Sequence, residues 1–246
     1  MYPEIACFVQ GRWTGAGARR KVLNPATGET LGEVPLADAA LLDQALVAAE
    51  AGFQEWRRVS AYDRYGVLRR AAGLLRDRAA AIGRILTLEQ GKPLREAQRE
   101  VTVAADTIEF LGEEARRAYG RIVPSRSPHT IEQTVRKEPV GPVLALTPWN
   151  YPADLPSRKL GGALAAGCSV ILKAAEETPG TVVEMVKCFI EAGLPANVLQ
   201  LVFGEPAFVS EYLIASPVIR KVSFTGSVSV GKRLAELCAR NMTRFT

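Results

Sequence analysis

The sequence predicts an α/β protein whose second half forms an open parallel sheet with flanking helices. From Val140 onward, short apolar runs alternate with helical patterns at short intervals, which is typical of strands joined by crossover helices. The first half is dominated instead by apolar residues that recur at helical spacing. The chain has 246 residues, 48% of them hydrophobic and 23% charged, which excludes a disordered, collagen-like or disulfide-stabilised scaffold.

The N-terminal part begins with short extended segments at residues 7–9 and 21–23, on either side of a glycine-rich stretch. Two amphipathic helices are expected to follow. Asp38 is the expected cap of the first helix, and Ser60 with Asp63 forms a capping box at the start of the second. Both helices are expected to face the core.

Two further helices and a hairpin complete the first half. A third helix is expected to stop at Gly91, because Pro93 lies just beyond it, and a fourth extends to Gly120. Residues 124–128 then form a turn, and polar and apolar side chains alternate after it. This pattern predicts a two-stranded hairpin within residues 121–138.

Four strands are expected in the second half. The helix after the second strand has Thr178 as its expected cap, Pro179 at its first position, and Gly193 then Pro195 at its end. The four strands are assigned to residues 140–146, 169–173, 198–203 and 220–224.

Ligands of an open parallel sheet bind beyond the carboxyl ends of its strands. Three segments follow strand ends here, at residues 147–152, 173–179 and 224–232, and all three are expected at one edge of the sheet. Gly226 and Ser227 precede a helix that begins near Val228. They suit a phosphate, because a helix N-terminus presents free N–H groups and partial positive charge.

The segment at 226–232 allows a rival interpretation, because its two glycines and lysine have the spacing of a P-loop. However, Arg233 stands where a P-loop needs Ser or Thr to hold magnesium, and no apolar strand ends in the Asp that a second metal contact requires. The chain also lacks a G-x-G-x-x-G fingerprint. Taken alone, the segment is equally well explained as a tight strand-to-helix turn.

Charge and hydropathy argue against nucleic-acid and membrane partners. The chain carries 31 Lys and Arg against 26 Asp and Glu, a net charge of +5, but the basic residues are interleaved with acidic ones over the helices. They predict a solvated basic surface. No run of about 18 apolar residues occurs, so no membrane span and no secretion signal are indicated.

The cysteines and the single histidine limit the available chemistry. The spacing of Cys7, Cys168, Cys188 and Cys238 fits neither a C-x-x-C motif nor a zinc pattern, and reduced thiols in a cytoplasmic protein are the default expectation. His129, the only histidine, is expected to be solvated in the hairpin. A metal site and most catalytic triads are therefore not expected.

Several segments together carry a resemblance to a known family. The chain resembles the N-terminal half of the aldehyde dehydrogenases over nearly its whole length, and residues 88–93, 119–125 and 216–226 are most similar to the succinate-semialdehyde dehydrogenase branch. The segments are Asn-Pro-Ala-Thr-Gly at 24–28, Leu-Glu-Gln-Gly-Lys-Pro at 88–93, Thr-Pro-Trp-Asn-Tyr-Pro at 147–152, Gly-Gly-Ala-Leu-Ala-Ala-Gly at 161–167, Lys173 with Glu176, Glu-Ala-Gly-Leu-Pro at 191–195 and Phe-Thr-Gly-Ser at 224–227.

The resemblance implies a Rossmann-like fold and a division of the chain. Residues 1–120 and 139–246 would form a dinucleotide-binding domain, and residues 121–138 an oligomerisation hairpin that makes a homo-oligomer. The family's catalytic domain, with the nucleophilic cysteine, the general-base glutamate and the strand that pairs with the hairpin, is expected to lie beyond Thr246. We therefore expect the 246 residues alone to expose apolar surface and to self-associate or be marginally stable.

The resemblance also implies roles for individual residues. Asn150 would donate its side-chain amide to the oxyanion of the tetrahedral intermediate, a kind of contact worth about 3 kcal/mol of barrier; without the motif around it, Asn150 would be a turn residue. Lys173 and Glu176 would reach the hydroxyls of the adenosine ribose; otherwise they would be exposed at a strand end. Other cofactor contacts are implied for Thr147, Pro148, Trp149, Gly204, Gly226 and Ser227.

Two details bear on the cofactor and on the nucleophile. Glu176 favours NAD over NADP, because a carboxylate disfavours a 2′-phosphate, although Lys173 could still pair with one. The family usually carries Thr where this chain has Val228, so one hydroxyl contact near the cofactor is missing. Each cysteine is expected to be a small buried apolar residue rather than a substitute nucleophile.

The function implied is NAD(P)-dependent oxidation of an aldehyde, such as succinate semialdehyde, to a carboxylate. This chain would carry the cofactor-binding half of that enzyme and would not turn over by itself. The alternative is a truncated, catalytically inactive module that binds a dinucleotide or a protein partner.

Overall fold

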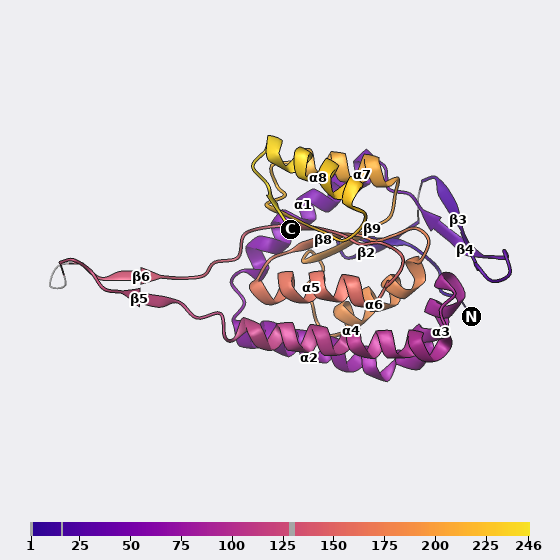
Figure 1. The fold of residues 1–246 in the computed structure, drawn as a ribbon, viewed down its shortest axis with the longest axis horizontal. Coiled ribbons are helices and arrows are strands. Elements are labelled where there is room, and N and C mark those ends of the chain that lie inside the picture. Colours follow the sequence, from indigo (N-terminus) through magenta and orange to yellow (C-terminus); the bar gives the residue numbers. More distant parts are fainter. Residues whose placement is uncertain (1, 16, 128–130) are drawn as a thin grey trace.

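The computed structural model describes residues 2–15, 17–127 and 131–246. Figure 1 shows a central sheet with helices on both of its faces and a two-stranded hairpin that projects from the body. The α/β class predicted from the sequence is confirmed, as is the parallel sheet in the second half.

The main sheet is parallel at its centre. Within the described residues its strand order is β11-β10-β7-β8-β9-β1-β2, and β7, β8, β9, β10 and β11 run parallel, whereas β1 and β2 are antiparallel to their neighbours. The strands are β1 (Cys7–Val9), β2 (Arg12–Thr14), β7 (Val143–Leu146), β8 (Val170–Lys173), β9 (Leu199–Val202), β10 (Lys221–Phe224) and β11 (Arg244–Phe245). A separate two-stranded sheet contains β3 (Arg19–Leu23) and β4 (Thr30–Pro35).

The central strands are apolar on both faces because helices cover both. In β7, Val143 and Ala145 belong to one buried cluster, whereas Leu144 and Leu146 belong to the other. This alternation follows from the two-residue period of a strand. The first cluster is packed by α2 (Ala61–Asp77), α3 (Ala79–Gln90), α4 (Leu94–Ala115), α5 (Asp154–Ala166) and α6 (Pro179–Glu191), and the second by α1 (Ala39–Trp56), α7 (Pro206–Ala215) and α8 (Val228–Arg240).

Local capping chemistry confirms the predicted starts and one predicted end. The Asp38 carboxylate accepts the backbone N–H of Leu41 at 2.9 Å, and the Ser60 hydroxyl accepts that of Asp63 at 3.1 Å. Gly91 ends α3 with a φ of 89°, the left-handed conformation that favours glycine. These boundaries depend on groups close in sequence, which is why the sequence predicts them.

Other boundaries differ from the prediction. The strand expected from Val140 begins at Val143, because Gly141 has a φ of 120° and Pro142 cannot donate to a neighbouring strand. The fourth helix ends at Ala115 rather than at Gly120. The sheet also takes in β1 and β11 at its two sides, which the sequence did not indicate.

The predicted hairpin is present and short. Strand β5 (Arg121–Val123) pairs antiparallel with β6 (Gln133–Val135), so the ladder is shorter than the span of 121–138. The predicted positions of Pro128 in the turn and of His129 lie outside the described residues.

Candidate functional site

The carboxyl ends of the parallel strands meet at one edge of the sheet, as predicted. Leu146 at the end of β7 is level with Lys173 of β8 and with Phe224 of β10. The chain continues this alignment past the strands, because the Thr147 N–H bonds the Lys173 carbonyl and the Thr225 N–H bonds the Leu146 carbonyl. The three predicted segments therefore begin side by side.

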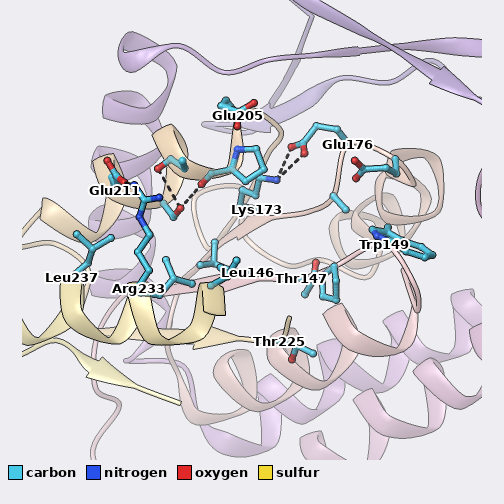
Figure 2. A pocket seen from close by; sticks show the side chains of 18 residues that line it. Leu146, Thr147, Trp149, Lys173, Glu176, Glu205, Glu211, Thr225, Arg233 and Leu237 are labelled. Atoms are coloured by element: carbon cyan, nitrogen blue, oxygen red, sulfur yellow. Dashed lines mark hydrogen bonds and ion pairs between the residues drawn. The ribbon is translucent and has the colours of Figure 1, made fainter. Parts of the chain in front are cut away.

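A cavity of about 430 Å³ opens at this edge (Figure 2). Trp149 lies at one end of it, and Arg233 and Leu237 of α8 lie at the other. Its volume is within the usual range for a small-molecule site. The lining residues are Leu146, Thr147, Pro148, Trp149, Lys173, Ala175, Glu176, Glu177, Glu205, Pro206, Ala207, Ser210, Glu211, Thr225, Val230, Arg233, Leu234 and Leu237.

The cavity brings together five of the residues predicted for cofactor binding, namely Thr147, Pro148, Trp149, Lys173 and Glu176. The other three predicted binding residues adjoin it without lining it: Gly204 precedes the lining residue Glu205, and Gly226 and Ser227 follow Thr225. Asn150, the predicted catalytic residue, is exposed on the same turn as Trp149 but outside the lining.

Lys173 and Glu176 are buried, so the interpretation of an exposed strand end is wrong. Their side chains form an ion pair with an Nζ–Oε1 distance of 2.7 Å, and only 8% and 2% of their areas are exposed (Figure 2). The Glu176 carboxylate also accepts the backbone N–H of Gly204 at 2.9 Å. The pair thus connects the end of β8 to the segment that follows β9. In that segment Gly204 has a φ of 158°.

The start of α6, beside this pair, is capped from a distant helix. The sequence predicts Thr178 as the cap of α6, but its side chain makes no capping hydrogen bond. Its hydroxyl donates instead to the Trp149 carbonyl at 3.4 Å. The buried Glu89 carboxylate of α3 accepts the N–H groups of Gly180 and Thr181, both at 2.8 Å. Burial raises the pKa of Glu89 to about 7, and hydrogen bonds from its donors oppose the rise.

The start of α8 is more open. Ser227 caps it through a long hydrogen bond of 3.4 Å from the N–H of Val230, and its hydroxyl also contacts that of Ser229 at 3.1 Å. Val228 exposes 77% of its side chain, so it forms little of the packing here. This N-terminus is free to receive an anion on its backbone N–H groups.

The sequence missed the helical contribution to the cavity. Val230, Leu234 and Leu237 recur at helical spacing along α8 and line its wall. Arg233 lines the same wall and pairs with Glu211 of α7. The spacing of the apolar residues was available in the sequence, but only the structure shows which side of α8 faces the cavity.

Comparison with known proteins decides the family. A family model described as "Aldehyde dehydrogenase family" matches residues 13–246. The chain belongs to the aldehyde dehydrogenase family. This assignment confirms the resemblance stated from the motifs.

Relatives within the aldehyde dehydrogenases differ in their named substrates. The chain is 52% identical over 99% of its length to 4-(hydroxymethyl)benzenesulfonate dehydrogenase TsaD1 of Comamonas testosteroni, covering 51% of that protein. It is 40% identical over 97% of its length to the NADP-dependent succinate-semialdehyde dehydrogenase GabD of Escherichia coli, covering 50%. The crystal structure of succinate-semialdehyde dehydrogenase from Burkholderia pseudomallei matches with a TM-score of 0.96 at 40% identity, over 99% of this chain and 51% of that one. The chain therefore spans about half the length of the relatives it matches.

The lining of the cavity is compatible in its chemistry with the NAD(P) that aldehyde dehydrogenases use. It combines an apolar wall on α8 with the polar groups of Thr147, Lys173 and Glu176, and it lies beside an anion-receptive helix N-terminus. The P-loop interpretation fails here, because α8 already begins at Val228 and so holds Gly231 inside a helix rather than in a phosphate loop.

The four cysteines are buried in the fold. Cys7, Cys168, Cys188 and Cys238 are buried free thiols, and burial raises the pKa of each, to about 11 for Cys7 and Cys188. The expectation of small buried apolar residues is confirmed. In the part of the chain that the structure describes, no group of three His, Cys, Asp or Glu side chains could hold a metal ion, and no helix is long and apolar enough to cross a membrane.

A partly buried lysine away from this edge was also missed, beside the amino-terminal ends of β7, β8 and β10. Lys159 of α5 lines a second cavity, of about 300 Å³, and donates to the Ser223 hydroxyl at 3.2 Å. Burial, together with the charge of Lys221, lowers the pKa of Lys159 to about 8. No motif around Lys159 indicates this environment, because it depends on β10.

Proposed function

We propose that this chain is the cofactor-binding half of an enzyme that oxidises an aldehyde to a carboxylate with NAD(P). The observation that carries the proposal is the family match over residues 13–246, together with a cavity at the strand ends that the motif residues line. When bound, the nicotinamide accepts the hydride that leaves the substrate. The chain's own residues hold and orient the cofactor.

Each motif residue has a proposed task. Thr147, Pro148 and Trp149 pack beside the ribose, and Lys173 with Glu176 receive the hydroxyls of the adenosine ribose. Support comes from their shared cavity and from the burial of the ion pair, which fixes both side chains before a ligand arrives. The remaining contacts are proposed for the backbone at Gly204, the backbone N–H groups at Gly226 and the hydroxyl of Ser227.

Asn150 is the proposed catalytic residue. Its amide would donate to the oxyanion that forms as the aldehyde is attacked, and its exposure beside the lining of the cavity supports this task. The attacking thiol and the general base are proposed to come from residues other than these 246, since all four cysteines here are buried with raised pKa values.

We propose NAD as the preferred cofactor, with NADP as the alternative. Glu176 lies at the ribose end of the proposed site, where a carboxylate repels a 2′-phosphate. The alternative is supported by the relative of Escherichia coli that is named for NADP, and by Lys173, whose charge could receive a phosphate.

The proposed substrate is an aldehyde that carries an anionic group, such as succinate semialdehyde. The names of the relatives support an anion, since those from Escherichia coli and Burkholderia pseudomallei are named for succinate semialdehyde and that from Comamonas testosteroni for a benzenesulfonate. Arg158 of α5, which pairs with Asp154 at 3.0 Å, supplies a candidate cation: with Phe110 and Leu111 of α4 it lines a shallow cavity of about 490 Å³. The higher identity to the benzenesulfonate relative favours an aromatic sulfonate aldehyde as the second candidate.

The hairpin is proposed to mediate homo-oligomerisation, and residues 1–120 with 139–246 to form the dinucleotide-binding domain. Ile122, Ile131 and Val135 expose 74%, 53% and 41% of their side chains on or beside the hairpin, which supports an interface there. The free thiols support a cytoplasmic location. The competing proposal is a truncated module that binds a dinucleotide or a partner without any oxidation.

Aldehyde-dependent NADH formation by the 246 residues alone tests the catalytic part of the proposal. We expect none with succinate semialdehyde or with a benzaldehyde sulfonate. Turnover that Asn150→Ala abolishes would show that the chain carries its own nucleophile, and would contradict the proposed division of labour.

A further inference from the structure

The turn between β7 and α5 is exposed, yet it carries Trp149 and Asn150. Trp149 and Tyr151 each expose 51% of their residue surface, and Asn150 is exposed as well. An exposed turn has few apolar contacts to fix it, so its geometry depends on directed polar contacts. Besides the long hydrogen bond from Thr178 to the Trp149 carbonyl, such contacts come from two charged residues of the N-terminal half, Lys92 and Glu100.

Glu100 reaches the turn from α4. It lies on the buried face of that helix, with 4% of its side chain exposed, three residues after Ala97 and four before Ala104. Its Oε1 atom accepts the N–H groups of Ala153 at 2.9 Å and Asp154 at 3.3 Å. Glu100 thereby caps α5, whose own first residues provide no side-chain cap.

Lys92 holds the other end of the turn. It follows the left-handed Gly91 and exposes 11% of its side chain. Its Nζ atom pairs with Oε2 of Glu100, donates to the carbonyl of Asn150 at 3.2 Å, and lies 4.1 Å from the centroid of the Tyr151 ring. The three N–H bonds of the ammonium thus have three acceptors.

These contacts converge on the residues that flank and include Asn150. A buried ion pair is on average no more stabilising than apolar residues of similar volume, but each of its hydrogen bonds specifies a direction. Here one charge fixes the carbonyl of Asn150 and the other fixes the first turn of α5. The peptide that carries the Asn150 side chain is therefore restrained from both sides.

We propose that Lys92 and Glu100 are positioning residues, a clamp that holds the Trp149–Asn150 turn in the orientation required for cofactor binding and for the oxyanion contact. The inference rests on the function proposed for that turn. It adds the task of two residues in the N-terminal half, one of them in the segment 88–93, for which no role was assigned above.

The clamp can be tested by NMR on the 246-residue chain without nucleotide. The variant is Lys92→Met with Glu100→Leu, which removes both charges together with the acceptor of the Ala153 and Asp154 N–H groups, and leaves no charge buried alone. The side-chain ¹⁵N–¹H signals of Trp149 and Asn150 report the turn, and they are assigned with Trp149→Phe and Asn150→Asp. The matched control is Ser169→Ala, which removes another buried hydrogen bond, from the Ser169 hydroxyl to the Ala49 carbonyl, at the opposite end of β8.

We expect both signals to shift in the double variant, and exchange of the Ala153 and Asp154 amide protons to accelerate about tenfold or more, as loss of one net hydrogen bond predicts. Neither change is expected in Ser169→Ala. Unshifted signals and unchanged exchange in the double variant would overturn the clamp. If that variant does not fold, Lys92→Met with Glu100→Gln is measured instead. It keeps an oxygen for the two N–H groups but loses the Lys92 contact to the Asn150 carbonyl, so the Asn150 signal is expected to shift, and an unshifted signal would overturn the clamp.

A second arm measures NAD binding by calorimetry. We expect the clamp variant to bind NAD about tenfold more weakly than the control, which is the effect of misplacing one directed contact. If NMR shows the turn displaced in the clamp variant but that variant binds NAD as tightly as Ser169→Ala does, the positioning role would be overturned. If the unaltered chain binds no NAD, the proposed function fails, whereas the NMR arm still decides whether the clamp holds the turn.

Discussion

The two sides of the cavity are built differently. On the side of β8 and α6, buried charges fix the chain: Lys173 pairs with Glu176, which accepts the Gly204 N–H, and Glu89 caps α6. On the side of β10 and α8, the exposed Ser227 caps the helix through one long hydrogen bond. One side is organised before any ligand binds, whereas the other relies on the backbone of an open helix N-terminus.

The difference indicates how the site divides its work. Fixed charges on the β8 side suit a ligand group that must be recognised in one orientation, such as a ribose. An open helix N-terminus suits a phosphate, because several N–H groups share the charge and tolerate small displacements. Substitutions should therefore cost most on the β8 side and least on the α8 side.

The largest effect is expected for Lys173→Met, which leaves the Glu176 carboxylate buried without its cation. Removal of one partner of a buried pair typically costs about 3–5 kcal/mol of unfolding free energy. Urea denaturation measures this loss. The control is Lys232→Met on the exposed surface of α8, for which a change within about 0.5 kcal/mol is expected. Equal losses of unfolding free energy in Lys173→Met and Lys232→Met would contradict the difference between the β8 and α8 sides of the cavity.

A pH-dependent effect is expected at Glu89. Its folded pKa of about 7 lies above its usual value of 4.5, so the folded protein holds the proton more tightly than the unfolded chain does. The resulting contribution to the unfolding free energy is about 3 kcal/mol. It is fully present below pH 4.5 and is lost as the pH rises through about 7.

Urea denaturation between pH 5 and pH 8, about the range of the pKa shift, tests the direction in which stability changes with pH. It is measured for the unaltered chain and for Glu89→Gln. The stability of the unaltered chain relative to Glu89→Gln should fall as the pH rises. Glu96→Gln, at an exposed position of α4, serves as the control and should follow the unaltered chain. A difference that stays constant with pH would contradict the raised pKa.

A smaller effect is expected for Ser227→Ala at the start of α8. Loss of an N-cap side chain costs about 1 kcal/mol, and the long, exposed hydrogen bond here places the cost at the lower end. Thermal unfolding measures the change, and Ser60→Ala provides a matched cap with a shorter bond of 3.1 Å. A larger loss at Ser227 than at Ser60 would show that the α8 side is more firmly held than its geometry indicates.

The smallest effect is expected for Val228→Thr, which restores the residue that the family usually carries. Val228 is exposed, so stability should change by less than about 0.5 kcal/mol. Affinity for NAD should stay the same or rise slightly, because the proposed site binds the phosphates through backbone N–H groups, which this substitution keeps. Weaker NAD binding by this variant, measured by calorimetry, would contradict that assignment of the contacts.

How far the sequence predicts the fold depends on the distance between partners. Asp38, Ser60 and Gly91 were placed correctly, because each acts on groups within a few residues of itself. Thr178 does stand at the N-cap position of α6, but its side chain makes no capping hydrogen bond, because the acceptor comes from Glu89, which is far away in the chain. The strand predicted to start at Val140 starts at Val143, although Pro142 could be seen in the sequence.

The site shows the same limit. The motifs identified five residues that line the cavity, because the ends of parallel strands meet at one edge. The burial of Lys173 and the restraint of Asn150 by Lys92 could not be predicted, since both depend on which charged side chains the fold brings together. Charge and motif alone do not distinguish a solvated lysine from a buried one.

Calorimetric titration of the chain with NAD, NADP and magnesium-ATP in parallel tests the central claim that this cavity is a dinucleotide site. We expect NAD to bind, with NADP weaker, and Glu176→Ala to reduce NAD affinity, because the carboxylate that receives the ribose is lost. Binding of magnesium-ATP alone, or NAD affinity that is unchanged by Glu176→Ala, would contradict the account.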